Sequence, residues 1–243
     1  MLEAFAWGIF AASSLIIGGA IALRFQISTF VIGLVMAFGA GVLISAVAYE
    51  LVLEAYLSSA GFDGVGIGLA AGALTFFVGD ALIDRMGGHN RKAADGPESG
   101  SSPLAIVLGI VLDGIPESVV LGLTLVAGEG IGVAVVAAVF LSNLPEAIAA
   151  TSGLSNVGWR GSRIMQLWVV VTLVSGIAAL LGYAVLEDAS PRTIAFVNAF
   201  AGGAILTMLA DTMMPEGFKY GGKLVGLLTT LGFFLAFVLT TLE

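Results

Sequence analysis

The stretch LDGIPES, Leu112–Ser118, places two carboxylates and a helix-disrupting proline in the middle of a long apolar run. A second stretch of similar form, LSNLPEA (Leu141–Ala147), lies inside the following apolar run. An ionised carboxylate at the centre of a lipid-facing helix costs at least ~2.5–3.5 kcal/mol. Each of these acids therefore needs a wet cavity, a partner or a cation, and that need constrains how the surrounding helices pack.

Composition indicates a membrane protein. Of the 243 residues, 58% are hydrophobic and only 11% are charged, and the mean hydropathy is +1.07. A soluble domain of this length is about one-quarter charged. The absence of cysteine excludes disulfides and thiolate metal sites, and a net charge of −8 gives no reason to expect nucleic-acid binding. The N-terminal MLEAFAWGIF lacks a basic region, so we expect a retained span and not a cleaved signal peptide.

The sequence predicts an all-α, polytopic membrane protein with eight transmembrane helices in a single transmembrane domain, residues 1–243. The predicted spans are Ala4–Leu23, Phe30–Leu57, Val65–Ile83, Pro103–Val126, Gly130–Ser152, Ile164–Leu186, Thr193–Met214 and Gly222–Leu242. The one long polar loop, about residues 85–102, has a composition typical of a flexible cytoplasmic segment. It contains the only histidine, His89, which we interpret as solvated.

Basic residues predict the orientation. Eight of the nine lie in alternate loops on one side: Arg24, Arg85, Arg91, Lys92, Arg160, Arg163, Lys219 and Lys223. The opposite loops contain only Arg192. The positive-inside rule then places both termini outside the cytoplasm, and we expect the protein to lie in the cell membrane.

Two pairs of segments resemble each other and predict inverted repeats. Residues 37–56 align with residues 199–218, so that Ala37 pairs with Ala199 and Glu54 with Glu216. LDGIPES likewise aligns with LSNLPEA. In the predicted topology each pair runs in opposite directions through the membrane. Inverted repeats with proline-containing helices and a midplane site are typical of transporters.

Three acids, Asp113, Glu117 and Glu146, are expected near the membrane midplane, whereas every lysine and arginine maps to a loop. Asp113 and Glu117 are four residues apart and share a helix face; Ser142 and Asn143 lie one turn before Glu146. Each proline also frees a backbone carbonyl one turn earlier, at Leu112 and at Leu141. These oxygens form a candidate site for a divalent cation.

Other interpretations remain open at this point. The acids could be protonated and hydrogen-bonded inside a bundle of kinked helices, or they could form a pathway for protons alone. A non-transporting metal or proton sensor, or a scaffold, would use the same residues. An intramembrane metallohydrolase is disfavoured because the spans contain neither HExxH nor any histidine, and we expect no enzymatic activity and no cofactor.

With these motifs, the chain resembles the ZIP family of divalent-metal transporters, the zinc/iron permeases. The resemblance rests on the paired Pro-Glu motifs, the long loop between spans 3 and 4, and the segments AFGAGVLISAVAYELVLEA, AFAGGAILTMLADTMMPEG and SGIAALLG. It implies a ZIP-like bundle in which spans 2, 4, 5 and 7 enclose a metal site. It also implies uptake of zinc, iron or manganese toward the cytoplasm by a rocking or elevator-like change, and dimers, which are common among relatives.

The motifs depart from the family pattern. In span 4 the family usually has His-Asn-x-Pro-Glu-Gly, and this chain has Asp113, Gly114 and Ser118 at the first, second and last positions. Ala179 stands where many relatives carry a metal-binding glutamate, and Glu50 stands where a histidine is frequent. The resemblance thus implies one surviving site and a second, bridged site that has lost its side-chain ligands.

The predicted metal ligands are Asp113, Glu117, Ser142, Asn143 and Glu146. Because all are oxygen donors, preference should move from zinc, the family default, toward Mn²⁺ or Fe²⁺. Further acids are expected along the ion pathway: Glu50 near the outer mouth, Asp211 and Glu216 toward the cytoplasm, and Asp80 near the inner end of span 3. The expected partners are divalent metal ions and membrane lipid.

Overall fold

The computed structural model describes residues 1–89, 93–95, 102–126 and 131–242, and its regular elements are helical. In chain order the α-helices are α1 (Leu2–Arg24), α2 (Thr29–Ala46), α3 (Gly61–Ile83), α4 (Pro103–Val126), α5 (Val133–Asn156), α6 (Gly161–Leu186), α7 (Pro191–Met208), α8 (Met214–Gly221) and α9 (Val225–Thr241). Four π-helical segments extend or join them: Val47–Leu53, Tyr56–Ala60, Asp84–Gly88 and Leu209–Met213. A 3₁₀ turn, Gly222–Leu224, precedes α9.

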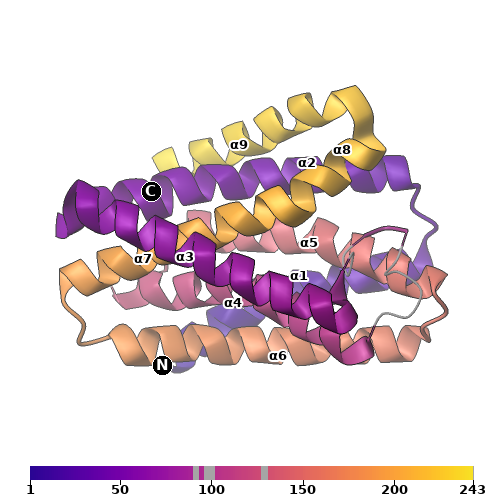
Figure 1. Cartoon of the computed structure of the whole chain (residues 1–243), viewed down its shortest axis with the longest axis horizontal. Helices are drawn as coiled ribbons and strands as arrows, with labels where there is room; N and C mark the ends of the chain where they lie inside the picture. The colour runs from indigo at the N-terminus through magenta and orange to yellow at the C-terminus, as the bar shows by residue number, and fades with distance from the viewer. Residues whose placement is uncertain (90–92, 96–101, 127–130, 243) are drawn as a thin grey trace.

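Seven helical runs in the described part of the chain are long and apolar enough to cross a membrane. The last of them, Pro191–Thr241, is 51 residues long and folds back on itself between α8 and α9 (Figure 1). The reversal occurs at Gly222, whose φ of 58° favours glycine because a Cβ is strained in that conformation. The molecule is therefore an all-α, multi-pass membrane protein.

Local signals in the sequence explain where helices begin. Ser28 caps α2 by accepting a hydrogen bond from the Val31 amide at 3.4 Å. Ser190 caps α7 in the same way, accepting from the Thr193 amide at 3.2 Å, and Pro191 occupies the first turn, where its missing N–H costs nothing. Pro116 and Pro145 both lie inside uninterrupted α-helices.

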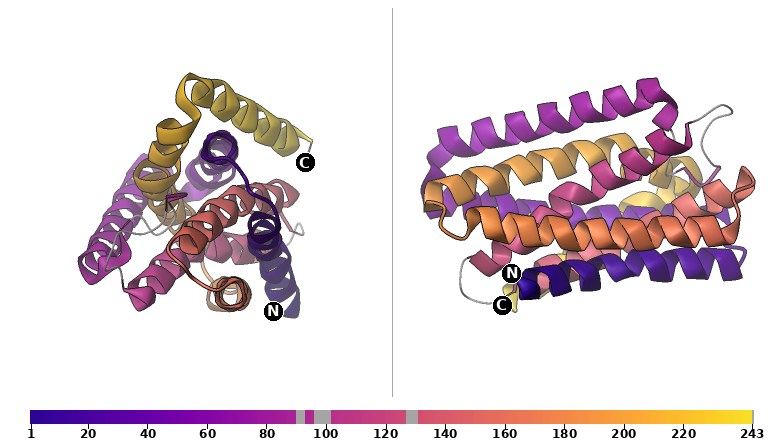
Figure 2. Two further views of the ribbon diagram at one scale, coloured as in Figure 1. Left: turned by 90° about the vertical axis from the view of Figure 1, so that its right-hand side faces the viewer. Right: turned by 90° about the horizontal axis from the view of Figure 1, so that it is seen from below.

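The helices form two blocks. In the first block, α1 packs against α5 and α6, and α6 packs against α4. In the second block, α2 packs against α8 and α9, and α3 packs against α7. The blocks meet where α2 lies against α5 and where α4 lies against α7. Both termini lie at the same end of the bundle, as two perpendicular views show (Figures 1 and 2).

Glycines make the packing inside each block tighter than the packing between blocks. A Cβ added to Gly72 of α3 or to Gly41 of α2 would overlap a backbone carbonyl of Phe200 or Thr229, in the same block. A Cβ added to Gly122 of α4 would likewise overlap the Ala179 carbonyl of α6. The same holds for the other described glycines. Wherever an added Cβ would lie closer than 3.0 Å to another atom, that atom belongs to the same block as the glycine.

Between the blocks, the nearest neighbours of the glycines Gly39 and Gly79 are side-chain atoms. The nearest atoms to a Cβ added at Gly39 are side-chain carbons of Met213 and Pro145, both at 3.0 Å; Pro145 belongs to the other block. At Gly79 the nearest atom is a Leu112 methyl at 3.3 Å. Close backbone contact locks helices together in lipid, so each block is built as a rigid unit with a more adaptable seam between the two.

This packing predicts opposite effects for two glycines of α3. Gly72→Ala should destabilise the protein by about 1–3 kcal/mol because the added methyl overlaps the Phe200 backbone. Gly66→Ala, the matched control, has no neighbouring atom within 4 Å and should be neutral or stabilising by up to ~1 kcal/mol. Thermal unfolding of both purified variants in one detergent measures this difference, and equal melting temperatures would contradict the packing argument.

Candidate metal centre

The five predicted ligands are all buried on two helices of the first block. Exposed fractions are 1% for Asp113 and 2% for Glu117 on α4, and 0% for Ser142, 6% for Asn143 and 4% for Glu146 on α5. Asp113 and Glu117 lie near the middle of α4 (Pro103–Val126), and Glu146 lies near the middle of α5 (Val133–Asn156). The burial of five polar residues at mid-helix is the main structural feature of this centre.

Local hydrogen bonds occupy two of the hydroxyl groups near these acids. The Ser142 hydroxyl donates to the Val139 carbonyl one turn earlier at 3.1 Å. The Ser118 hydroxyl donates to the Gly114 carbonyl at 2.7 Å. Because each hydroxyl proton is directed to the helix backbone, the oxygen of Ser142 keeps lone pairs that can accept a proton or bind a cation.

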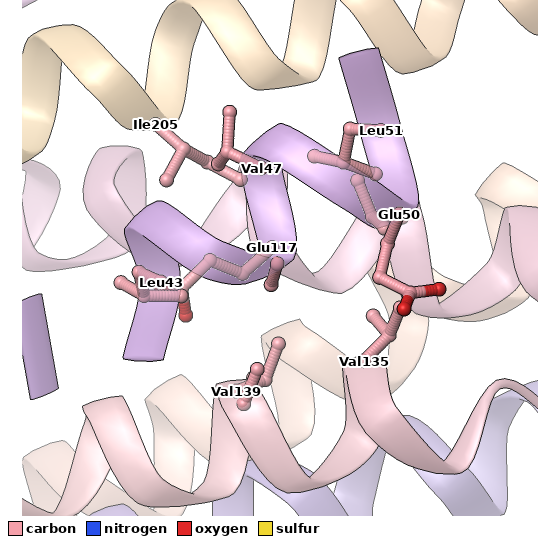
Figure 3. A pocket seen from close by; sticks show the side chains of 11 residues that line it. Leu43, Val47, Glu50, Leu51, Glu117, Val135, Val139 and Ile205 are labelled. Atoms are coloured by element: carbon pink, nitrogen blue, oxygen red, sulfur yellow. The ribbon is translucent and has the colours of Figure 1, made fainter. Parts of the chain in front are cut away.

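Glu117 and Glu50 line one small pocket between the two blocks. The other walls of the pocket are apolar. They come from α2, the π-helical segment Val47–Leu53, α4, α5 and α7. The apolar lining residues are Leu43, Ala46, Val47, Leu51, Val120, Val135, Ala138, Val139 and Ile205. Space for the centre of a water molecule amounts to about 10 Å³, which is the volume needed for a single water. Figure 3 shows that the two carboxylates do not point toward one another.

A larger, more open pocket adjoins Glu50 from the other side. It has about 450 Å³ of water-accessible space and is lined by Tyr49, Glu50, Leu53, Glu54, Leu57, Ser58 and Thr240. Glu50 thus belongs to both pockets. The π-helical turn of Val47–Leu53 positions it, and such turns are frequent at functional sites. Nothing in the apolar pattern of span 2 signals this turn.

The remaining predicted pathway acids lie on the second block. Asp211 belongs to the π-helical segment Leu209–Met213, and Glu216 lies in α8. Asp80 lies near the end of α3, one turn before Asp84. Nδ1 of His89 lies 3.2 Å from a carboxylate oxygen of Asp84. This histidine, which the sequence analysis interprets as solvated, therefore also has a carboxylate partner.

The structure does not draw the acids into one cluster. Among the described residues, no three His, Cys, Asp or Glu side chains lie close enough together to hold a metal ion. The arrangement brings two helices with buried oxygen donors to the seam between blocks, and it brings Glu50 and Glu117 to one pocket. A cation held here would need oxygens from hydroxyl, amide or backbone groups in addition to carboxylates.

The fold and these buried acids define a multi-pass α-helical membrane protein with a polar centre. No protein-family model matches the chain. Over 190 residues, 77% of this chain, the sequence is 25% identical to a curated protein of Arabidopsis thaliana named "Putative zinc transporter". The chain spans 30% of the length of that protein. It is a distant homologue of that protein, which agrees with the resemblance to zinc/iron permeases.

The two pockets predict a sharp difference in thiol accessibility. The chain has no cysteine, so one introduced thiol is the only target. Ser58→Cys, in the 450 Å³ pocket, should react quickly with a membrane-impermeant methanethiosulfonate, because that space admits the reagent. Glu117→Cys should react at least about tenfold more slowly, because the 10 Å³ pocket admits no more than a water.

Ser142→Cys, at a residue with 0% exposure, is the control for a fully buried position. Reaction of Glu117→Cys as rapid as that of Ser58→Cys would show that the centre is open to solvent. Applying the reagent from one side of sealed vesicles at a time also tests which face of the membrane the larger pocket adjoins.

Proposed function

We propose that this protein moves divalent metal ions across the cell membrane toward the cytoplasm, through a site formed by Asp113, Glu117, Ser142, Asn143 and Glu146. The observation that carries the proposal is the burial of these five oxygen-bearing residues at mid-helix on α4 and α5. The distant homology to a protein named as a zinc transporter supports it. The protein acts as a transporter and not as an enzyme.

The proposal includes eight spans and not seven. The run Pro191–Thr241 reverses at Gly222, so that α9 packs back along α2. Counting this run as two passes also agrees with both termini lying at one end of the bundle (Figure 2), since that arrangement requires an even number of passes. The basic loops predicted to be cytoplasmic then share the other end, and both termini are extracytoplasmic.

Inverted repeats are supported by the π-helical turns. The segments Val47–Leu53 and Leu209–Met213 begin at paired positions, each ten residues after the aligned Ala37 and Ala199. Both segments carry a pathway acid, Glu50 in one and Asp211 in the other. We infer that the two halves place these acids on opposite sides of the centre, with Glu50 on the outer route and Asp211 and Glu216 on the inner route.

The block structure supports an alternating-access change. The five site residues belong to the first block, while Glu50 and Asp211 belong to the second. Movement along the adaptable seam would shift the site from one set of acids to the other without disturbing the tight glycine contacts. The close approach of Gly122 to the Ala179 carbonyl also leaves little room for a second metal site between α4 and α6.

Uptake of radioactive manganese or zinc into proteoliposomes tests the function. Wild-type protein should accumulate the ion, and Glu117→Ala and Glu146→Ala should each abolish accumulation, because each removes a charged oxygen ligand from a dry centre. Glu187→Ala, at an exposed acid beyond the end of α6, is the matched control and should transport normally. Uptake at the wild-type rate by both site variants would contradict the proposal.

Metal preference is tested by a single substitution at Asp113. Oxygen donors favour manganese or iron relative to zinc, whereas imidazole favours zinc. Asp113→His should therefore raise the ratio of zinc to manganese affinity, because it replaces an oxygen donor with an imidazole. Competition of each ion against the other during uptake measures the ratio, with Asp188→His as the control at an exposed position.

A sensor or scaffold remains the second candidate. The finding that favours it is that no three of the described acids or histidines converge to hold an ion. Metal-dependent thermal stabilisation without any uptake by wild-type protein would support this candidate over transport.

A further inference from the structure

The connection between α3 and α4 contains a short segment, Ala93–Asp95, that docks into the bundle. Ala93 is 3% exposed and Ala94 is 1% exposed, although connecting loops normally run over the surface with their backbone in water. These two residues are buried although the composition of the loop is typical of a flexible segment. A buried loop needs partners for its backbone groups, and the Ala94 carbonyl has one in Asn156.

Residues from α5 and α8 hold the segment in place. The side-chain amide of Asn156, the last residue of α5, donates to the Ala94 carbonyl at 3.1 Å. The Ala94 amide lies near the carboxylate of Glu216 on α8. The Lys219 ammonium of α8 pairs with the Asp95 carboxylate at 2.8 Å, and this hydrogen-bonded pair lowers the pKa of Asp95, so that the carboxylate remains charged at neutral pH.

These partners belong to different blocks. Asn156 ends α5 in the first block, whereas Glu216 and Lys219 lie on α8 in the second. The Ala94 carbonyl contacts the first block through Asn156, and the adjacent Asp95 carboxylate contacts the second block through Lys219. The segment therefore spans the seam at the end of the bundle where α8 turns into α9, and relative movement of α5 and α8 there would break at least one of these two contacts.

We propose that Ala93–Asp95 is a latch that ties the two blocks together at the end of the bundle opposite the termini, and that it must release for the blocks to move. Its role in the cycle rests on the proposed transport function, but its docking does not. The latch is held by one exposed ion pair and one hydrogen bond from a side chain to the backbone. Such contacts are individually weak, which suits a tie that has to open and close repeatedly.

Charge reversal tests the docking in the full chain. Asp95→Lys and Lys219→Asp should each increase hydrogen exchange of the Ala94 amide by about two- to fivefold, the effect of losing one exposed ion pair. The double variant Asp95→Lys/Lys219→Asp should restore slow exchange, because it rebuilds the pair with its charges swapped. Mass spectrometry on the peptide containing Ala94 measures the rates, corrected for the intrinsic effect of each substitution.

Two further variants keep the test decisive. Asn156→Ala removes the contact with the first block and should also speed exchange, without changing any charge. Asp188→Lys, at an exposed acid near the opposite end, is the control and should leave exchange at Ala94 unchanged. Unchanged exchange in the single variants, or failure of the double variant to restore it, would overturn the latch.

Uptake of radioactive manganese by the same variants tests the link to transport. The single charge reversals should raise the initial rate by about two- to fivefold, and the double variant should return it toward wild type. Rates that do not rise in the single variants would overturn the role of the latch in the cycle. If wild-type protein takes up no metal while exchange follows the predicted pattern, the proposed function fails and the docking stands.

Discussion

The desolvation of carboxylates inside an apolar bundle is the constraint on which this structure depends. Asp113, Glu117 and Glu146 are each at most 4% exposed, in a chain whose composition offers few polar groups to surround them. A buried charge of this kind costs several kcal/mol unless it is compensated. The Ser142 hydroxyl and the Asn143 amide lie on the same helix as Glu146, and in the proposed function a cation from solution supplies the opposite charge.

The constraint also explains why the molecule is built as two blocks. Small residues let helices approach until their backbones touch, which gives rigid packing in lipid without any hydrophobic driving force. That packing stays within each block, as at Gly72 against Phe200 and at Gly122 against Ala179. Glu117 lies instead in the pocket at the seam, where the nearest neighbours of Gly39 and Gly79 include the Pro145 ring and a Leu112 methyl. Rigidity and adaptability are thus separated in space.

Much of this architecture follows from the sequence because apolar length and charge placement act directly on the membrane fold. The span Pro103–Val126 matches α4 to the residue, and the burial of all five predicted ligands agrees with the pattern of acids and prolines. The π-helical turns could not be predicted, because one extra residue in a turn leaves no trace in an apolar sequence. The buried Ala93 and Ala94 were likewise hidden, since their burial depends on Asn156 and Lys219, which are distant in the chain.

The π-helical turns connect the local and the global features of the fold. The π-helical turn of Val47–Leu53 carries Glu50, which lines the same pocket as Leu43 of α2 and Glu117 of α4, and such turns are frequent at functional sites. The π-helical segment Leu209–Met213 carries Asp211, which is exposed and does not line this pocket. The helical run of α2 and Val47–Leu53 thus packs against α9 within its own block and also brings the Glu50 carboxylate to the pocket that Glu117 lines.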